Sequence, residues 1–177
     1  MSVKLLNSPR RVWLCISLAC IGLLSFGMYL QHVVGLEPCP MCIVQRYAMI
    51  LMLLVALMGS LVSGRVPTLL VGGSLVLLAE GGAYVAARQS WLQWNPPEAV
   101  SCGRDFYGMI ETFPLKQAIP MIFKGSGDCS KVDWTFLGGS IANWSFVAFL
   151  VLGTVALVTT LRVLRPQSMA VQADSAV

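Results

Sequence analysis

The sequence contains few charged residues. Asp, Glu, Lys and Arg make up only 11% of its 177 residues, whereas hydrophobic residues make up 56%. Soluble domains carry about 25% charged residues, so this chain cannot cover a water-soluble globule with a solvated surface. The formal net charge of +4 is small and scattered, which argues against nucleic acid as a partner. We therefore expect a membrane protein in contact with lipid.

Histidine is almost absent, and the cysteine pattern does not favour a metal. The chain has one His and six Cys, with a single Cys-x-x-Cys motif at Cys39–Cys42. Structural zinc sites are built from four Cys or His ligands, commonly as two closely spaced pairs. We therefore predict no metal site and interpret His32 as an ordinary residue near the membrane interface.

Long apolar segments are the main feature of the sequence. They cover about 13–30, 43–62, 66–87 and 144–161, and each reaches or approaches the roughly 20 residues that cross a bilayer. A backbone in hydrocarbon must satisfy its own hydrogen bonds, so these segments should be helices. The first lacks a small-x-small cleavage pattern and is expected to remain as an anchor. The fold class is therefore an all-α membrane protein, a four-transmembrane-helix bundle forming one domain over 1–177.

The connections between the segments differ in length. A loop of about 31–42 joins the first two segments, and a long loop of about 88–143 joins the last two. Within the long loop, residues 110–123 mix apolar and polar positions, which predicts a short amphipathic helix lying in the membrane interface. The small, polar tail at about 166–177 is predicted to be disordered.

Basic residues mark one end of each segment. This set comprises Lys4, Arg10, Arg11, Arg65, Arg162 and Arg165. Because short cytoplasmic segments next to membrane helices are rich in Lys and Arg, both termini are predicted to be cytoplasmic. The two loops that contain cysteines then lie on the opposite, outer side.

The six cysteines fall into two groups. Two lie in the first apolar segment and are predicted to pack as small hydrophobic residues: Cys15 and Cys20. The other four lie in the outer loops, where an oxidising environment favours disulfides: Cys39, Cys42, Cys102 and Cys129. The spacing of Cys39 and Cys42 indicates a redox pair. A bridge between the remaining two would close a long loop, either as a second redox pair or as a structural link.

Two charged residues lie at or within the apolar segments. Arg46 follows Cys42 by four residues and so shares its helix face. Either its side chain extends to the head groups, or its charge stabilises a thiolate at Cys42 or an anion on a bound acceptor. Glu80 lies inside the third segment, where an acid has either a functional role or a solvated position near the interface.

Two motifs are specific enough to indicate a family. They are Cys39-Pro40-Met41-Cys42 followed by Gln45-Arg46-Tyr47, and Gly125-Ser126-Gly127-Asp128-Cys129 followed by Trp134 and Leu137-Gly138. Together with the helix count and the loop order, they make nearly the whole chain resemble the DsbB-type disulfide-bond-forming proteins of the bacterial inner membrane.

The resemblance implies an enzyme, a protein-dithiol:quinone oxidoreductase. In this family DsbA, a soluble thioredoxin-fold oxidase, delivers two electrons to the Cys102–Cys129 disulfide, and Cys102 forms the mixed disulfide. The electrons then pass to Cys39 and Cys42. The resemblance further implies that Cys42 interacts with ubiquinone or menaquinone, that Arg46 is the quinone-site arginine, and that the cysteine loops are periplasmic.

The chain also departs from some of these proteins. Some relatives carry a histidine in the stretch that matches residues 89–93, where this chain has none. Two other functions are consistent with the cysteine pattern: a related membrane oxidoreductase with a different dedicated partner, or a membrane scaffold held by disulfides without catalysis.

Overall fold

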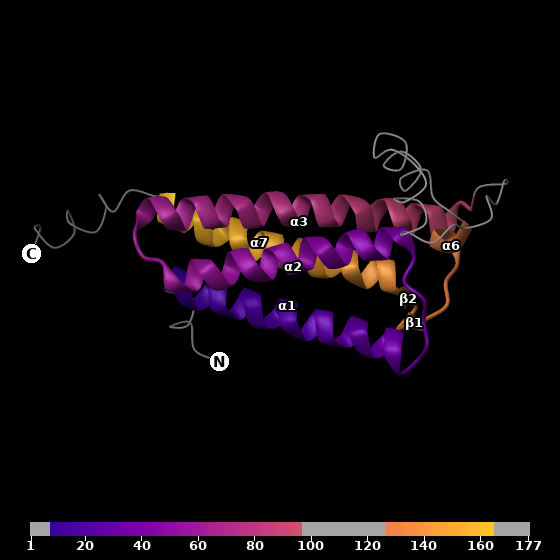
Figure 1. The fold of residues 1–177 in the computed structure, drawn as a ribbon. Helices are drawn as coiled ribbons and strands as arrows, with labels where there is room; N and C mark the ends of the chain where they lie inside the picture. Colours follow the sequence, from indigo (N-terminus) through magenta and orange to yellow (C-terminus); the bar gives the residue numbers. More distant parts are fainter. Residues whose placement is uncertain (1–7, 97–126, 165–177) are drawn as a thin grey trace, which may run out of the picture.

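The computed structural model describes residues 8–96 and 127–164. Four long helices form a bundle in this part of the chain (Figure 1): α1 (Pro9–His32), α2 (Pro40–Leu61), α3 (Arg65–Trp94) and α7 (Ile141–Leu164). All four are long and apolar enough to cross a membrane. The predicted all-α fold with four candidate membrane-spanning helices is therefore confirmed.

Two smaller elements lie at one end of the bundle. The short helix α6 (Gly127–Ser130) precedes an antiparallel hairpin of β1 (Thr135–Phe136) and β2 (Gly139–Ser140). Figure 1 shows both at the end where α1 finishes and α2 begins. The sequence did not predict the hairpin, because two-residue strands are too short to produce an alternating pattern.

Helix α3 is longer than the hydropathy pattern predicts. Its apolar stretch was expected to end at residue 87, yet the helix continues to Trp94. Residues 88–94 contain neither Gly nor Pro, so nothing interrupts the helix. Gln89 and Leu92 are buried on the inner side of this extension, whereas Trp91 and Trp94 are exposed. Part of the predicted loop is therefore an amphipathic continuation of α3.

The other helices begin three or four residues before their predicted starts. Pro9 and Pro40 occupy the first turns of α1 and α2. Proline is favoured there because its fixed φ suits the helix and its missing N–H has no intrahelical partner. The helix starts therefore include polar and proline residues that an apolar window omits.

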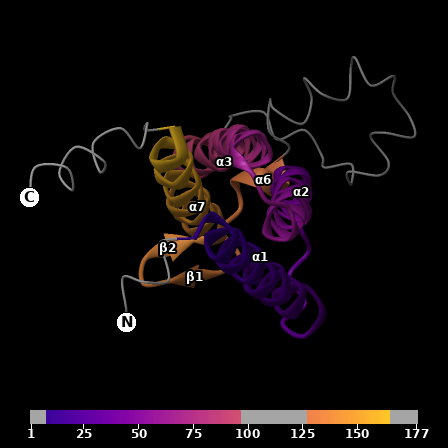
Figure 2. The ribbon, with the colours of Figure 1, turned by 90° about the vertical axis from the view of Figure 1, so that its left-hand side faces the viewer.

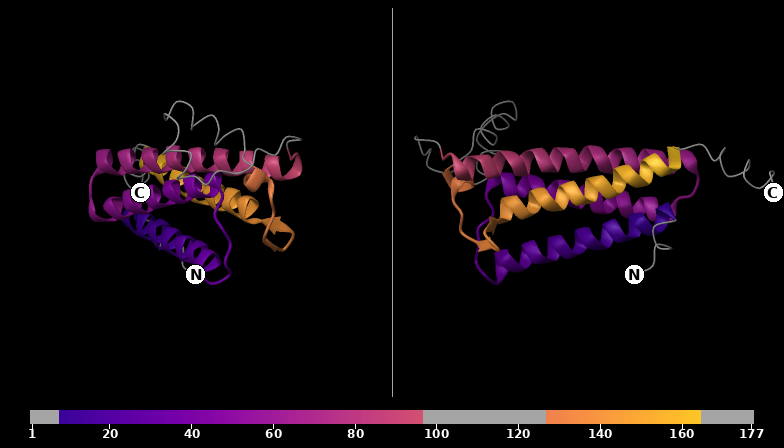
Figure 3. Two further views of the ribbon diagram at one scale, coloured as in Figure 1. Left: turned by 45° about the vertical axis from the view of Figure 1, so that its right-hand side comes forward. Right: turned by 180° about the vertical axis from the view of Figure 1, so that it is seen from behind.

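Helices α3 and α7 pack side by side through small residues (Figure 3). Gly72 lies against Thr160, Gly82 against Phe149, and Gly153 against Ala79. Small residues at membrane helix interfaces allow close approach of the backbones, which increases van der Waals contact.

Viewed along the bundle, α1 and α3 lie at opposite corners, with α2 and α7 between them (Figure 2). At the end that carries the N-terminus, Trp13 of α1 is buried in the core. Toward the other end, α1 diverges from α7 (Figures 1 and 3). The bundle is therefore closed at one end and splayed at the end that carries the cysteines.

Arginines occupy the closed end. Arg10 Nε donates to the Val62 carbonyl at 2.9 Å, and Arg65 Nη2 donates to the Leu164 carbonyl at 2.9 Å. The carbonyls in the last turn of a helix have no intrahelical donor, and they carry the negative end of the helix dipole. These cations therefore stabilise the C-terminal ends of α2 and α7.

The hairpin is tied to α3 by one hydroxyl. Its turn residues, Leu137 and Gly138, have φ values of 51° and 80°, as a type I′ turn requires. Ser140 Oγ donates to Gln93 Oε1 at 2.6 Å and accepts from the Asn143 N–H at 3.4 Å. Ser140 therefore caps the start of α7 and links it to the extension of α3.

Several predicted features lie outside the described residues. These are the amphipathic helix at 110–123, Cys102, Lys4, Arg165 and the tail at 166–177.

Adjacent glycines on α3 provide a test of the α3–α7 contact. A Cβ at Gly82 would overlap the buried ring of Phe149, whereas a Cβ at Gly81 would meet nothing within 4 Å. We expect Gly82→Ala to lower the free energy of unfolding in detergent by about 1–3 kcal/mol. Gly81→Ala, the matched control, should cause no loss. Equal thermal stability of the two variants would contradict this packing.

Candidate functional site

Three sulfurs gather where α2 begins. Cys39 is the N-cap of α2, and its Sγ accepts a hydrogen bond from the Cys42 N–H at 3.3 Å. The Cys39 thiol donates to Cys42 Sγ, with the two sulfurs 2.8 Å apart. Cys129 of α6 is fully buried in the same cluster as Cys39, together with Val85 and Leu92 of α3. The structure therefore brings three of the four predicted redox cysteines together.

Cys39 keeps its proton to a higher pH than a free cysteine. Hydrogen bonds to Cys129 and to Cys42, followed by burial, raise the pKa of the Cys39 thiol well above its usual range. The Cys39 S–H donates to Cys42, and a bond in which the thiol is the donor favours its protonated form. Cys39 therefore interacts with both of the other sulfurs, and these interactions favour its thiol over its thiolate form.

A pair of glutamines contacts these sulfurs. Gln89 Nε2 lies 3.3 Å from Cys39 Sγ and 3.2 Å from Cys42 Sγ. Gln45 Nε2 donates to Gln89 Oε1 at 2.7 Å. Both side chains are buried. Sequence reasoning assigned no role to either residue, although an uncharged polar residue on the inner side of an apolar helix is a usable signal.

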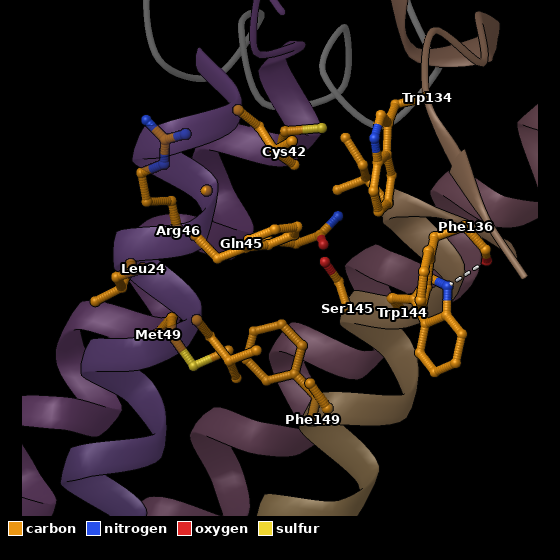
Figure 4. Close-up of a pocket in the computed structure, with 16 residues that line it drawn as sticks. Leu24, Cys42, Gln45, Arg46, Met49, Trp134, Phe136, Trp144, Ser145 and Phe149 are labelled. Carbon is orange, nitrogen blue, oxygen red and sulfur yellow. Dashed lines mark hydrogen bonds between the residues drawn. The ribbon is translucent and has the colours of Figure 1, made fainter. Parts of the chain in front are cut away.

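A pocket of about 570 Å³ opens beside Cys42. Residues of α1, α2 and α7 and of the hairpin line it, and most of them are apolar. Figure 4 shows Cys42, Gln45 and Met49 of α2 on one side and Ser145 and Phe149 of α7 on the other. The volume falls within the range of small-molecule sites, about 300–1,000 Å³. The pocket occupies the splayed end of the bundle, where α1 diverges from α7.

Aromatic rings form one wall of the pocket. Trp134 makes an edge contact with Phe26 at a centroid distance of 5.9 Å and stacks on Phe136 at 6.1 Å. Trp144 lies 6.2 Å from Phe136, and its Nε1 donates to the Phe136 carbonyl at 2.9 Å (Figure 4). These rings join α1, the hairpin and α7, so they hold the wall together across the splayed end.

Arg46 lies at the edge of the pocket, one helical turn from Cys42. Its Nη1 donates to Gln31 Oε1 of α1 at 2.6 Å, and its Nη2 approaches Gly27. The residues that the structure describes provide no carboxylate partner for this guanidinium. Its positive charge is therefore held next to an apolar cavity by a neutral amide, an arrangement that favours a negatively charged group nearby.

The other residues considered from the sequence lie elsewhere. Glu80 is exposed on α3, His32 is exposed at the end of α1, and Cys15 and Cys20 lie within α1. Of these, only Cys20 is packed into the core between the helices. Within 8–96 and 127–164, no three Cys, His, Asp or Glu side chains are grouped to hold a metal ion.

The chain is similar to known proteins over most of its length. The family model for disulfide bond formation protein DsbB matches residues 9–159. Disulfide bond formation protein B of Polaromonas naphthalenivorans is 64% identical over 165 residues, covering 93% of this chain and 99% of the relative. The protein of the same name from Albidiferax ferrireducens is 71% identical over 156 residues, covering 86% and 88%. That from Aromatoleum aromaticum is 51% identical over 156 residues, covering 88% and 94%.

The hydrogen bonds of Cys39 predict a distinct alkylation profile. A free cysteine has a pKa of about 8.5, and the raised pKa of Cys39 keeps it protonated above that pH. In the fully reduced protein, iodoacetamide should modify Cys39 more slowly than a free thiol at about pH 8.5. The midpoint of its pH profile should also lie higher, as measured by mass spectrometry of the Cys39 peptide.

Removing a partner tests the cause of this shift. Cys129→Ala should move the midpoint of the Cys39 profile downward, because it removes the first of the two hydrogen bonds. Cys15→Ala, distant on α1, should leave the profile unchanged. An unaltered midpoint in Cys129→Ala would show that Cys129 does not hold the proton on Cys39.

Proposed function

We propose how this chain, which belongs to the DsbB family of membrane dithiol:quinone oxidoreductases that reoxidise DsbA, carries out that reaction. Electrons pass along neighbouring cysteine sulfurs to the pocket beside Cys42. The observation that carries the proposal is the order of the described sulfurs. Cys129 contacts Cys39, Cys39 contacts Cys42, and Cys42 lines the pocket. Each transfer can then occur between neighbouring groups.

The thiol–disulfide steps follow from this order. DsbA, as its dithiol, reduces the Cys102–Cys129 disulfide through a mixed disulfide at Cys102, which leaves Cys129 as a thiolate. Cys129 then attacks Cys39 in the Cys39–Cys42 disulfide. A Cys129–Cys39 bond forms, the Cys39–Cys42 bond breaks, and its electron pair leaves on Cys42 as a thiolate. The second thiol of the DsbA dithiol attacks the mixed disulfide, which releases oxidised DsbA and frees Cys102 as a thiolate. Attack by Cys102 on Cys129 in the Cys129–Cys39 bond then restores the loop disulfide and frees Cys39 as the second thiol of the reduced pair.

The pocket fits the ring of a quinone. Its lining is almost entirely apolar, with Trp134, Phe136 and Phe149 supplying flat faces and Cys42 at the edge. A quinone held there would supply a two-electron, two-proton acceptor beside Cys42. The proposed role of Arg46 is to stabilise negative charge beside Cys42 during this transfer, since no carboxylate of the described chain neutralises it. The apolar walls accept either ubiquinone or menaquinone.

Redox potentials support an acceptor of this kind. DsbA is a strong oxidant, with a potential of about −120 mV, so its reoxidation needs a still more oxidising sink. A lipid-soluble quinone reaches a pocket at a helix mouth directly from the bilayer. We propose that the cysteine end faces the periplasm and the arginine end faces the cytoplasm, which places both termini in the cytoplasm.

The function can be tested with purified protein, reduced DsbA and a ubiquinone or menaquinone analogue. Cys42→Ser should abolish quinone reduction, because the electron pair cannot leave on the sulfur that lines the pocket. The loss should be at least about a thousandfold, as for removal of a reacting nucleophile. Cys15→Ala should retain the full rate. Quinone reduction by Cys42→Ser at the rate of the unaltered protein would rule the proposal out.

The partner can be identified by trapping. In Cys129→Ala the Cys102 thiol has no loop partner and can attack the disulfide of an oxidised partner to form a mixed disulfide. Because Cys129 is absent and cannot reverse this bond, the covalent complex should accumulate and persist until reductant is added. We expect a thioredoxin-fold oxidase of the DsbA type in this complex, identified by mass spectrometry after expression in the native host. A complex with a different dithiol protein would instead favour the alternative of another dedicated partner.

A further inference from the structure

We propose that Gln89 is a catalytic residue that stabilises the reduced form of the Cys39–Cys42 pair, and that Gln45 positions it. This inference rests on the proposed exchange route, and it assigns a role to side chains that touch the reacting sulfurs without belonging to the cysteine relay itself. The side-chain amide nitrogen of Gln89 carries two N–H groups and can donate two hydrogen bonds. Cys39 Sγ lies 3.3 Å and Cys42 Sγ 3.2 Å from that nitrogen, so the amide can donate one hydrogen bond to each sulfur.

A hydrogen bond from Gln45 fixes the orientation of the Gln89 amide. Gln45 Nε2 donates to Gln89 Oε1 at 2.7 Å. An amide oxygen that accepts this bond must point toward Gln45, and the amide nitrogen then points toward the sulfurs. A contact from the Cys42 thiol to Gln89 Oε1 also exists but is longer, at 3.7 Å. The donor nitrogen of Gln89 is therefore closer to Cys42 Sγ than the acceptor oxygen is.

A donor aimed at sulfur stabilises one redox state over the other. When Cys129 attacks Cys39, the electron pair of the Cys39–Cys42 bond moves to Cys42, which leaves as a thiolate. A thiolate accepts a charge-assisted hydrogen bond, which is roughly twice as strong as a neutral one. The sulfurs of a disulfide carry no such charge. Gln89 therefore favours the reduced pair, which makes Cys39–Cys42 a better electron acceptor for the loop cysteines.

The position of Gln89 argues against a direct contact with the quinone. Gln89 is only 3% exposed and is not among the residues that line the pocket, whereas Cys42 and Gln45 are. It comes from α3, and it approaches the sulfurs from a helix that supplies no residue to the pocket. The amide therefore acts on the sulfurs, and Gln45 bridges it to the pocket.

The test measures the redox equilibrium of Cys39–Cys42 in the full-length protein in detergent. Samples are equilibrated in glutathione buffers without quinone, and differential alkylation with mass spectrometry gives the reduced fraction. Gln89→Met should lower the equilibrium constant for reduction by about 10- to 100-fold, which corresponds to a potential about 30–60 mV more negative. Gln45→Met should shift it in the same direction by a smaller factor, because Gln89 remains but loses its fixed orientation.

Gln93→Met is the matched control. Gln93 lies one turn further along α3 and bonds Ser140 and the Lys131 carbonyl, with no sulfur contact, so its replacement should leave the equilibrium unchanged. Equal shifts in all three variants would indicate a general loss of packing and would overturn the proposal. An unchanged equilibrium in Gln89→Met with a raised KM for quinone would also overturn it, since Gln89 would then contact the quinone. If Gln89→Met does not fold, the shift in Gln45→Met decides the question.

The redox equilibrium of Cys39–Cys42 tests the role of Gln89, whereas the rate of quinone reduction tests the proposed function. The glutathione measurement contains no quinone, so it reports on Gln89 even if the acceptor pocket is elsewhere. A shifted equilibrium in Gln89→Met together with unimpaired quinone reduction in Cys42→Ser would support the role of Gln89 and reject the proposed route. The reverse pair of results would reject the role of Gln89 alone.

Discussion

The contact between Gly82 and the ring of Phe149 brings α3 and α7 close together, and both helices supply residues around the sulfurs and the pocket. Phe149 is almost fully buried, and its ring occupies the space that a side chain at Gly82 would take. The same ring lines the pocket beside Cys42. A close α3–α7 contact thus positions the pocket wall and, at the end of α3, the buried amide of Gln89. The helix-packing contact in the middle of the bundle and the pocket at its end therefore share one aromatic ring.

The membrane setting explains how the polar groups of the site are arranged. An unpaired polar group in an apolar environment costs several kcal/mol, so each needs a partner. Gln45 pairs with Gln89, Gln89 with the sulfurs, and Arg46 with Gln31. These bonds connect α2 to α3 and to α1. The same interactions that satisfy the polar groups therefore align three helices around Cys42.

Because α1 diverges from α7, the pocket lies between helices at one end of the bundle. At the closed end, Trp13 fills the core, whereas at the other end the space between α1, α2 and α7 is walled by aromatic rings of the hairpin and its neighbours. Trp134 and Phe136 are held in this wall by ring contacts with Phe26 of α1 and Trp144 of α7. A two-stranded hairpin, which is weak alone, becomes part of the site through these contacts.

The sequence alone was sufficient to predict the four membrane helices, because spanning length and low charge leave few alternatives in hydrocarbon. It also led to the prediction of Cys39, Cys42, Cys102, Cys129 and Arg46 as site residues, from the placement of the cysteines and the family resemblance. Only the tertiary structure revealed Gln45 and Gln89, which are 44 residues apart in the chain, and the order in which the sulfurs approach the pocket. The sequence pattern of a helix predicts that helix alone. The contacts of Gln45 and Gln89 depend on how neighbouring helices are aligned, and side-chain packing sets that alignment.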